Sequence, residues 1–493
     1  MLALRRTTIA YFCIALFLLN VLYLYSHWER QPVISLEDRR SQLWQQLHPL
    51  LEEFKPNCPQ PALHDTAGAR RFDAVNESPR ENYVSNVDEI QLPMQAAHDG
   101  FVQAIRNLEV NRPYIRGTTG IVSSAGGDYL PTFLVSLLLL RRTGSTLPVE
   151  VFMKDRTEYE PEICETVLPR LGAKCLVLSD ILTGQDFAAQ ENLQSLPEIE
   201  GFQIKSFAML FSSFEEFLWL DADCVALYDP RSIFNSEPFI STGFVTWPDF
   251  WVNSAAPVYF DISRQAEPLS TTRQATEAGI LLVSKETHLS TLILAAYYNY
   301  YGPDYYYILL GQDAPGTGDK DTFLHAATAL NQTFYAVSET AVDIGNITPW
   351  DPEVAVNAGY IQADPIQDYS LTSQGKWRVK DPSIFSSPPR AFFVHAGDPE
   401  FNPGKELLGE KLTGFDGEPT RLWTYPPEAM QRLGWDVEKV FWEVTLAVVC
   451  DMQPPFQSWE SEVRLCERTR EHWEAVFENP DATVPEFVVA VSN

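Results

Sequence analysis

The feature that most constrains the fold is a regular alternation of apolar, strand-like segments with helical segments, which begins near Gly117. The predicted strands are "TTGIVSS", "LPVEVF", "AKCLVL" and "EEFLWL", and the predicted helices between them are "YLPTFLVSLLLLRRTG", "EPEICETVLPRLG" and "FQIKSFAMLFSSF". Successive strand–helix–strand units make right-handed crossovers, which place helices on both faces of a largely parallel sheet. We therefore expect an α/β domain with a Rossmann-like central sheet over residues 113–415.

Two carboxylates, Asp221 and Asp223, follow the fourth predicted strand in "FLWLDADCVALYDP". Ligands of open α/β sheets collect beyond the carboxyl ends of the strands. In one interpretation both carboxylates hold Mg²⁺ or Mn²⁺ against a diphosphate. In the other, Asp221 attacks phosphate as the nucleophile of a haloacid-dehalogenase-type phosphatase. That enzyme needs a later acid pair, and "GDKDTFL" has Phe323 where the second acid should lie. The absence of this second acid argues against the phosphatase and favours a metal site at Asp221 and Asp223.

The N-terminal segment predicts a membrane anchor. Residues 7–26 contain no charged side chain, are long enough as a helix to cross a bilayer core, and follow two arginines. The basic flank leaves residues 1–6 in the cytosol and the remaining chain in the lumen. A cleaved signal peptide is the alternative. We expect a single-pass type II membrane protein with a lumenal stem over residues 27–112 and a mainly helical extension over residues 416–493.

Charge and cysteine content fit a lumenal protein that does not bind nucleic acid. The net charge of −30 argues against a polyanionic partner. Six cysteines follow the predicted anchor, an even number that permits disulfides in an oxidising compartment. The nearest pairs are Cys164–Cys175 and Cys450–Cys466, with free buried thiols as the alternative.

Four further segments follow the Asp-x-Asp strand in order: "STGFVTWPDFW", "ATEAGILLVSKETH", "GDKDTFLHAATAL" and "AFFVHAG". With "LPVEVF", the Asp-x-Asp strand and the N-terminal anchor, they resemble the fungal Golgi α-1,3-mannosyltransferase family, glycosyltransferase family 71. The resemblance covers about residues 115–400. It implies a type A glycosyltransferase fold, GDP-mannose as donor, Mn²⁺ as metal, retention of the anomeric configuration, and residence in the Golgi membrane.

His395 is the candidate third metal ligand. It closes the apolar run "RAFFVH" and so ends a predicted strand. An imidazole beside two carboxylates suits Mn²⁺ better than Mg²⁺, which is the alternative metal. The resemblance likewise implies that Asp221, Asp223 and His395 hold the ion. Family members commonly carry a lysine shortly after this histidine, whereas here the next lysine is Lys405, which puts a diphosphate-binding role for it in doubt.

Three carboxylates are the candidate catalytic residues. Glu277 precedes the strand-like "AGILLVSK", in a Glu-Ala-Gly where family members often have Glu-Ser-Gly. It could hold a sugar hydroxyl or lie beneath the anomeric carbon, and its structural alternative is an acid at a helix start. Asp319 and Asp321 flank Lys320 in "GDKD". The resemblance implies that Asp319, Lys320 and Asp321 contact donor sugar and acceptor, with Lys320 as a substrate-binding residue, and helix capping is the alternative.

Substrate-binding candidates come from two further segments. Lys205 lies on the helix that leads into the Asp-x-Asp strand and is the local cation for a nucleotide phosphate, with a solvated surface lysine as the alternative. Trp247 and Asp249 of "WPDFW" could form an acceptor wall, because an indole packs against sugar C–H groups and a carboxylate accepts hydroxyl hydrogen bonds. A buried core tryptophan is the alternative.

The sequence thus predicts a Mn²⁺-dependent, retaining α-1,3-mannosyltransferase that moves mannose from GDP-mannose to a protein-linked glycan. Its expected partners are the nucleotide sugar, the glycan acceptor and the Golgi membrane, and no protein partner is indicated. The alternatives are a transferase that uses a UDP-sugar, the phosphatase, and a non-catalytic scaffold. The sequence does not choose between a front-face reaction and a covalent path through Glu277, Asp319 or Asp321.

Overall fold

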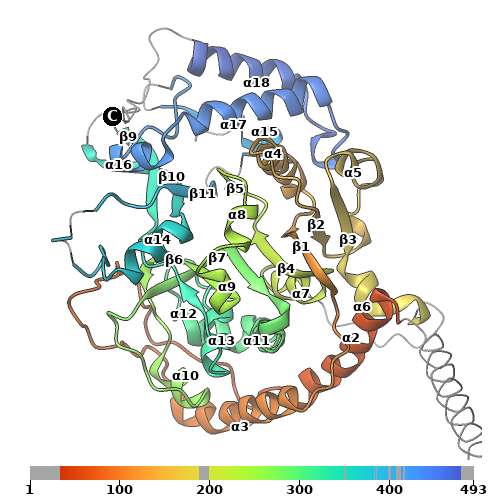
Figure 1. The fold of residues 1–493 in the computed structure, drawn as a ribbon, viewed down its shortest axis with the longest axis vertical. Coiled ribbons are helices and arrows are strands. Elements are labelled where there is room, and N and C mark those ends of the chain that lie inside the picture. The colour runs from red at the N-terminus through yellow and green to blue at the C-terminus, as the bar shows by residue number, and fades with distance from the viewer. Residues whose placement is uncertain are drawn as a thin grey trace, which may run out of the picture.

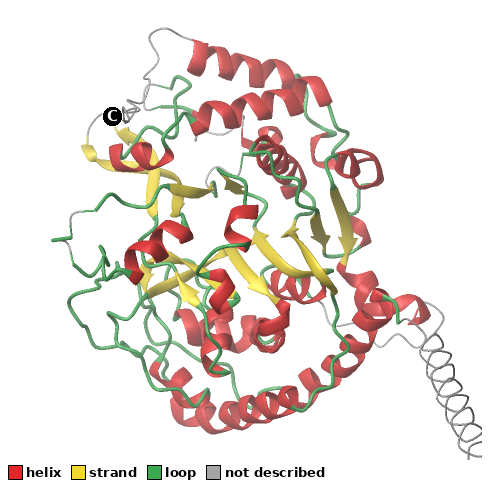
Figure 2. Ribbon diagram, viewed as in Figure 1, coloured by secondary structure: helices red, strands yellow, loops and turns green. Residues whose placement is uncertain are grey.

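A seven-stranded sheet lies at the centre of the computed structural model (Figures 1 and 2). The structure describes residues 34–187, 199–348, 351–397 without 382 and 385, 401–406, 412–414 and 417–478. In spatial order the strands are β3 (Ala173–Val177), β2 (Val149–Met153), β1 (Ile115–Ser124), β4 (Phe214–Leu220), β7 (Gln274–Ser284), β6 (Phe244–Val252) and β8 (Tyr335–Ala336). Within this sheet β7 alone runs antiparallel to the other strands. The predicted α/β class with a largely parallel sheet is confirmed.

A second, antiparallel sheet adjoins the carboxyl end of β4 (Figure 1). Its strands are, in order, β5 (Cys224–Ala226), β11 (Ala391–His395), β10 (Asp351–Ala363) and β9 (Val342–Thr348). β5 follows Asp223 directly and pairs with β11, so that Cys224 lies opposite His395. This pairing brings β11, a strand from late in the chain, close to the end of β4. His395, which ends β11, therefore lies near Asp221 and Asp223.

Helices cover both faces of the central sheet. The longer ones after the first strand are α4 (Tyr129–Arg142), α6 (Leu178–Phe187), α7 (Gln203–Phe211), α11 (Lys285–Tyr300), α13 (Thr322–Ala329) and α14 (Pro365–Ser373). Side chains of β4 alternate between the two cores. Leu218 packs in the core that contains α4, and Trp219 packs in the core that contains α7 and α11. The apolar run before Asp221 is therefore buried on both sides.

Two helices from the segment expected to form a stem pack on the main domain. They are α2 (Leu36–Glu53) and α3 (Val87–Arg106), which curve around the outside of the sheet (Figure 1). The apolar face of α2 is buried in one core with Phe207 and Phe211 of α7. Phe101 of α3 stacks on Tyr297 of α11, with ring centroids 4.2 Å apart. Residues 34–112 thus contribute to the hydrophobic core.

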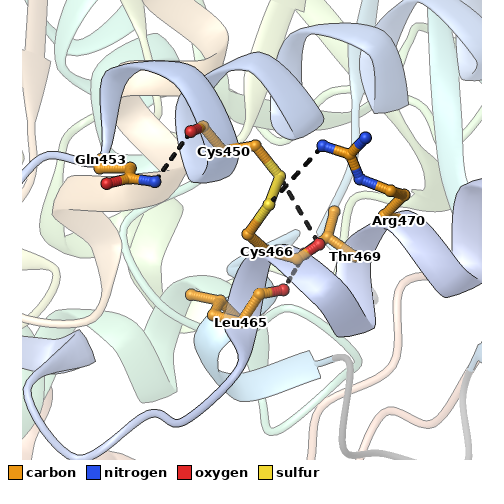
Figure 3. Close-up of a disulfide and its surroundings, with 6 residues drawn as sticks. All are labelled: Cys450, Gln453, Leu465, Cys466, Thr469 and Arg470. Atoms are coloured by element: carbon orange, nitrogen blue, oxygen red, sulfur yellow. Dashed lines mark hydrogen bonds between the residues drawn. A yellow bond between two sulfur atoms is a disulfide. The ribbon is translucent and has the colours of Figure 1, made fainter.

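The C-terminal segment is mainly helical, with α16 (Pro427–Leu433), α17 (Val437–Leu446) and α18 (Leu465–Trp473). A disulfide between Cys450 and Cys466 joins the turn after α17 to the start of α18 (Figure 3). A second disulfide, Cys164–Cys175, fastens β3 to the preceding helical segment. The two nearest pairs that the sequence offered are thus bridged, and the free thiols of the alternative are found at Cys58 and Cys224.

The predicted membrane anchor, residues 7–26, lies outside the described residues. Among the helices that the structure does describe, none combines the length and the apolarity needed to cross a bilayer.

The packing of α2 can be tested by a cavity-forming substitution. Leu47→Ala removes a side chain with 0% exposure, whereas Leu92→Ala removes one that is 70% exposed on α3. We expect Leu47→Ala to lower the free energy of unfolding by about 2–5 kcal/mol, and Leu92→Ala to change it by less than about 0.5 kcal/mol. Urea denaturation of the purified chain measures both. Equal, small effects would show that α2 is not part of the core.

Candidate active site

A cleft of about 720 Å³ opens at the carboxyl ends of β1, β2 and β4. The start of β7 also reaches it, because β7 runs antiparallel to β4 and therefore begins where β4 ends. The cleft is rich in ionisable side chains. Its acidic residues are Glu158, Glu200, Asp221, Asp223, Asp249, Glu277 and Asp319, and its basic residues are Lys154, Lys205, Lys320 and His395.

One buried ammonium group joins two of these carboxylates. The Lys205 Nζ lies 3.0 Å from an Asp221 carboxylate oxygen and 3.1 Å from an Asp319 carboxylate oxygen. It also donates to the Ala278 carbonyl at 2.9 Å. The contact with Asp319 is an ion pair only, because that Asp319 oxygen has no hydrogen-bond partner among the described residues. Lys205 lies in the cleft, where it is buried and forms ion pairs with two carboxylates.

A second network links Glu277, Tyr360, His395 and Asp223. The Tyr360 hydroxyl donates to Glu277 at 2.6 Å and lies 2.6 Å from His395 Nδ1. On the other side of the ring, His395 Nε2 is 3.3 Å from an Asp223 oxygen. The Tyr360 hydroxyl has one proton, and it donates this proton to Glu277. Its contact with His395 is therefore a hydrogen bond only when Nδ1 of the ring carries a proton and donates it to the hydroxyl oxygen. Tyr360 therefore directs Nε2 of the ring toward Asp223.

Glycine is required where β7 passes this network. A Cβ on Gly279 would lie 2.7 Å from Glu277 Oε1, 2.9 Å from the His395 ring and 3.0 Å from Cys224 Sγ. The Gly279 amide also donates to Glu277 at 2.5 Å, and its carbonyl accepts from the Asp221 amide at 2.9 Å. The Glu-Ala-Gly of the sequence thus supplies both a carboxylate and the space that it needs.

Burial and mutual charge shift the pKa values of these groups in opposite directions. Burial, together with Asp221, raises the pKa of Asp319 to about 6, although Lys205 opposes the shift. Burial also disfavours the anion of Glu277, but hydrogen bonds from His395 and Tyr360 outweigh it and lower its pKa to about 2. The pKa of Lys205 is raised because Asp221 and Asp319 outweigh its burial. Near neutral pH, Glu277 is therefore an anion and Lys205 a cation.

Asp249 and Lys320 form an ion pair in the lining of the cleft. Their charged atoms are 2.6 Å apart, and the Lys320 ammonium also donates to the Pro315 carbonyl at 2.9 Å. Both residues were predicted to bind substrate, and both reach the cleft. Lysine and carboxylate satisfy each other here, so the pair offers a polar wall of low net charge.

Two predicted site residues do not line the cleft. Trp247 is fully buried, donates its indole N–H to the Ala363 carbonyl at 2.9 Å and packs edge-on against Phe393. Trp247 therefore occupies a core position, which was the structural alternative to the predicted acceptor wall. The Asp321 carboxylate accepts from the Thr276 amide at 3.0 Å and the Thr276 hydroxyl at 3.1 Å, and so fastens the start of β7 to α13. Both side chains are buried and lie outside the lining of the cleft.

The ligand chemistry at the end of β4 fits a small divalent cation. Ligating atoms of Asp221, Glu277 and His395 lie within 4.8 Å of one another, as do those of Asp223, Cys224 and His395. Carboxylate oxygens with one imidazole nitrogen form a set that suits Mn²⁺. The sequence prediction placed Asp221, Asp223 and His395 in one site, and the structure brings each carboxylate near His395, in two separate groups of ligating atoms. It adds Glu277 and Tyr360 around the same ring.

Tyr360 is the functional candidate that sequence reasoning missed. It lies in "NAGYIQA", which carries no strand-end acid and no charged neighbour. Only the register of the second sheet, where Tyr360 pairs with His395, places it at the site. A polar residue at the position opposite His395 could have been sought only once that pairing was known.

Comparison with known proteins identifies relatives of the chain. A family model described as "Mannosyltransferase putative" matches residues 118–276 and 270–367. The α-1,2-mannosyltransferase MNN21 of Candida albicans is 31% identical over 405 residues, which are 72% of this chain and 61% of the relative. MNN24 of the same organism, also named an α-1,2-mannosyltransferase, is 37% identical over 52% of this chain and 39% of its own.

A relative from a second organism gives a similar picture. The α-1,2-mannosyltransferase MNN2 of Saccharomyces cerevisiae is 29% identical over 73% of this chain and 69% of its own length. The chain spans less than two thirds of the length of the two Candida relatives.

Among solved structures, the glycosyltransferase GlyE of Streptococcus pneumoniae is 14% identical and covers 44% of this chain and 45% of its own. Its TM-score is 0.28, a value too low to carry an argument. With half of its length matched by the family model, the chain belongs to this mannosyltransferase family, glycosyltransferase family 71, which the ordered motifs of its sequence had predicted.

Proposed function

We propose that the protein is a Mn²⁺-dependent glycosyltransferase of the type A fold that moves mannose from GDP-mannose to a hydroxyl of a protein-linked glycan. The observation that carries the proposal is the charge of the cleft. Seven acidic side chains line it against three lysines, and Lys205 and Lys320 are already paired with carboxylates. A diphosphate would be repelled from such a cleft unless a divalent cation came with it.

Asp221, Asp223 and His395 would hold this cation. Asp223 has its carboxylate 3.3 Å from His395 Nε2, and Asp221 is kept in place by the Trp219 indole N–H at 2.7 Å and by Lys205. Mg²⁺ is the alternative metal. When bound, the ion supplies a Lewis acid that offsets the charge that develops on the departing diphosphate. Lys205 contributes by keeping Asp221 and Asp319 from repelling each other.

The partners of Glu277 and Asp319, the two candidate nucleophiles that line the cleft, favour a front-face reaction. Glu277 accepts from Gly279 and Tyr360 through its two oxygens, and Asp319 is paired with Lys205. These partners stabilise the two anions and so weaken them as nucleophiles toward an anomeric carbon. In the front-face path the acceptor oxygen bonds to the anomeric carbon as the bond to the diphosphate breaks. The proton of the acceptor hydroxyl passes to the leaving phosphate oxygen, and the configuration is retained.

The linkage and the compartment are the finer parts of the proposal. The motifs of the sequence suggested an α-1,3 linkage, whereas the relatives compared above are named α-1,2-mannosyltransferases. We therefore take α-1,2 as the favoured linkage and α-1,3 as the second candidate. The two disulfides suit an oxidising compartment. They support a Golgi lumenal domain carried by an anchor at residues 7–26.

A donor screen tests the proposed reaction. The purified full-length chain should release GDP from GDP-mannose with Mn²⁺ and should lose this activity with EDTA. Asp223→Asn should lower the rate by about 10²-fold or more, because it removes a charged ligand. The matched control is Asp229→Asn. Asp229 lies eight residues after Asp221, is half-buried outside the cleft and pairs with Arg231, so its substitution should leave the rate unchanged. Turnover of UDP-sugars but not GDP-mannose would reject the donor. Release of phosphate from simple monoesters would support the phosphatase instead.

The role of Tyr360 can be measured without turnover. Tyr360→Phe removes the hydroxyl that fixes the His395 ring, and loss of such an outer partner typically weakens metal binding by about 10–100-fold. Calorimetric titration with Mn²⁺ should show this loss. The control Tyr335→Phe removes a hydroxyl that is bonded to Asp368 at 2.7 Å, away from the cleft, and it should leave Mn²⁺ affinity unchanged. Equal affinities in both variants would contradict the role.

A further inference from the structure

The segment between α2 and α3 crosses the surface beside the active site (Figure 1). We call residues 62–84 of it the strap. Its backbone pairs with the end of β6: the Phe72 amide donates to the Phe250 carbonyl at 3.1 Å, and the Val252 amide donates to the Arg70 carbonyl at 3.0 Å. Arg71 and Trp251 form an antiparallel bridge between these bonds. The strap is thus held by main-chain bonds that do not depend on the side chain of Arg71.

The register of the second sheet places this bridge close to the metal-binding residues. Cys224, His395, Tyr360 and Asp343 lie opposite one another on β5, β11, β10 and β9. Side chains at directly paired positions share a face of the sheet, and neighbouring strands are about 4.8 Å apart. Asp343 therefore lies about 10 Å from His395, on the same face of the sheet, a distance of roughly the span of two linked sugar rings.

Arg71 meets Asp343 at the far end of this row. Its guanidinium is 2.9 Å from the Asp343 carboxylate and 4.7 Å from the ring centroids of both Phe250 and Trp251. Phe250 in turn packs edge-on against Tyr360, with centroids 5.2 Å apart. A continuous set of contacts thus connects the Tyr360–His395 pair to the Arg71 side chain.

The polar groups at this point are open to solvent. The Arg71 side chain is 58% exposed and the Asp343 side chain 32% exposed. Among the described residues, Asp343 is the hydrogen-bond partner of the Arg71 guanidinium, which leaves most of its five N–H groups available. An exposed ion pair of this kind adds about 1 kcal/mol or less to stability. Stability of the fold therefore gives little reason for this arrangement of guanidinium, carboxylate and indole.

We propose that Arg71, Asp343 and Trp251 form an acceptor subsite for the sugar ring next to the one that receives mannose. The inference rests on the proposed function. The guanidinium and the carboxylate offer a donor and an acceptor to neutral hydroxyls, and the half-buried indole offers an apolar surface to the C–H groups of the ring. The subsite lies outside the acidic cleft, so it takes the uncharged acceptor and not the nucleotide.

The test compares a one-ring acceptor with a two-ring acceptor. The full-length chain is assayed with GDP-mannose, Mn²⁺ and either methyl α-mannoside or α-mannobiose, and kcat/KM is measured for each. The wild-type chain should prefer the disaccharide by about tenfold, as expected for one or two hydrogen bonds to charged groups. Arg71→Ala and Asp343→Ala should each reduce this ratio toward one. Arg71→Lys, which keeps the charge but has fewer donors, should give a ratio between those of the wild-type chain and Arg71→Ala.

Arg264→Ala is the matched control. Arg264 is 63% exposed and pairs with Asp99 at 3.0 Å, so it resembles Arg71 in exposure and pairing but lies on another surface. Its substitution should leave the disaccharide preference unchanged. A wild-type ratio of one, or an unchanged ratio in Arg71→Ala and Asp343→Ala, would overturn the subsite while mannose transfer itself stands. Absence of transfer to either acceptor would overturn the proposed function, and the subsite with it.

Discussion

The site depends on one buried ammonium group placed between two carboxylates. Asp221 and Asp319 come from segments almost a hundred positions apart, and Lys205 holds an oxygen of each within 3.1 Å. Without that cation, two acids would face each other in a buried place, and each would be driven to take up a proton. Because Lys205 also donates to the carbonyl of Ala278, it ties the end of β4 to the start of β7. The geometry of the cleft follows from this tie.

The second constraint is the pairing of β5 with β11. β5 begins one residue after Asp223, and its partner strand ends in His395. The two strands that carry the ligands are therefore hydrogen-bonded to each other, although they are far apart in the chain. Tyr360 on β10 extends the same row and fixes the ring of His395 through Nδ1. The four-stranded sheet thus both carries His395 and sets the orientation of its imidazole ring.

Sequence reasoning recovered the parts of the site that obey a simple rule. The apolar runs that precede Asp221 and His395 are strands, as predicted, whereas the second, antiparallel sheet that brings the end of β11 to the start of β5 was not predicted. Contacts that depend on orientation were not accessible. The apolar neighbours of Trp247 fit both an exposed wall and a core position, and only the twist and bulges of β6 turn its indole inward. The partners of Lys205 and the position of Tyr360 depend on how β7 and β10 are paired, which no local pattern encodes.

The packing of α2 has a consequence for where the enzyme works. α2 begins at Leu36 and its inner face belongs to the domain core. With the proposed anchor ending at residue 26, nine residues separate the two. Fully extended, nine residues reach about 30 Å, which is shorter than the diameter of a domain of this size. On the proposed anchoring, a tether of this length would hold the folded domain near the lipid surface and so limit the directions from which an acceptor could reach the cleft.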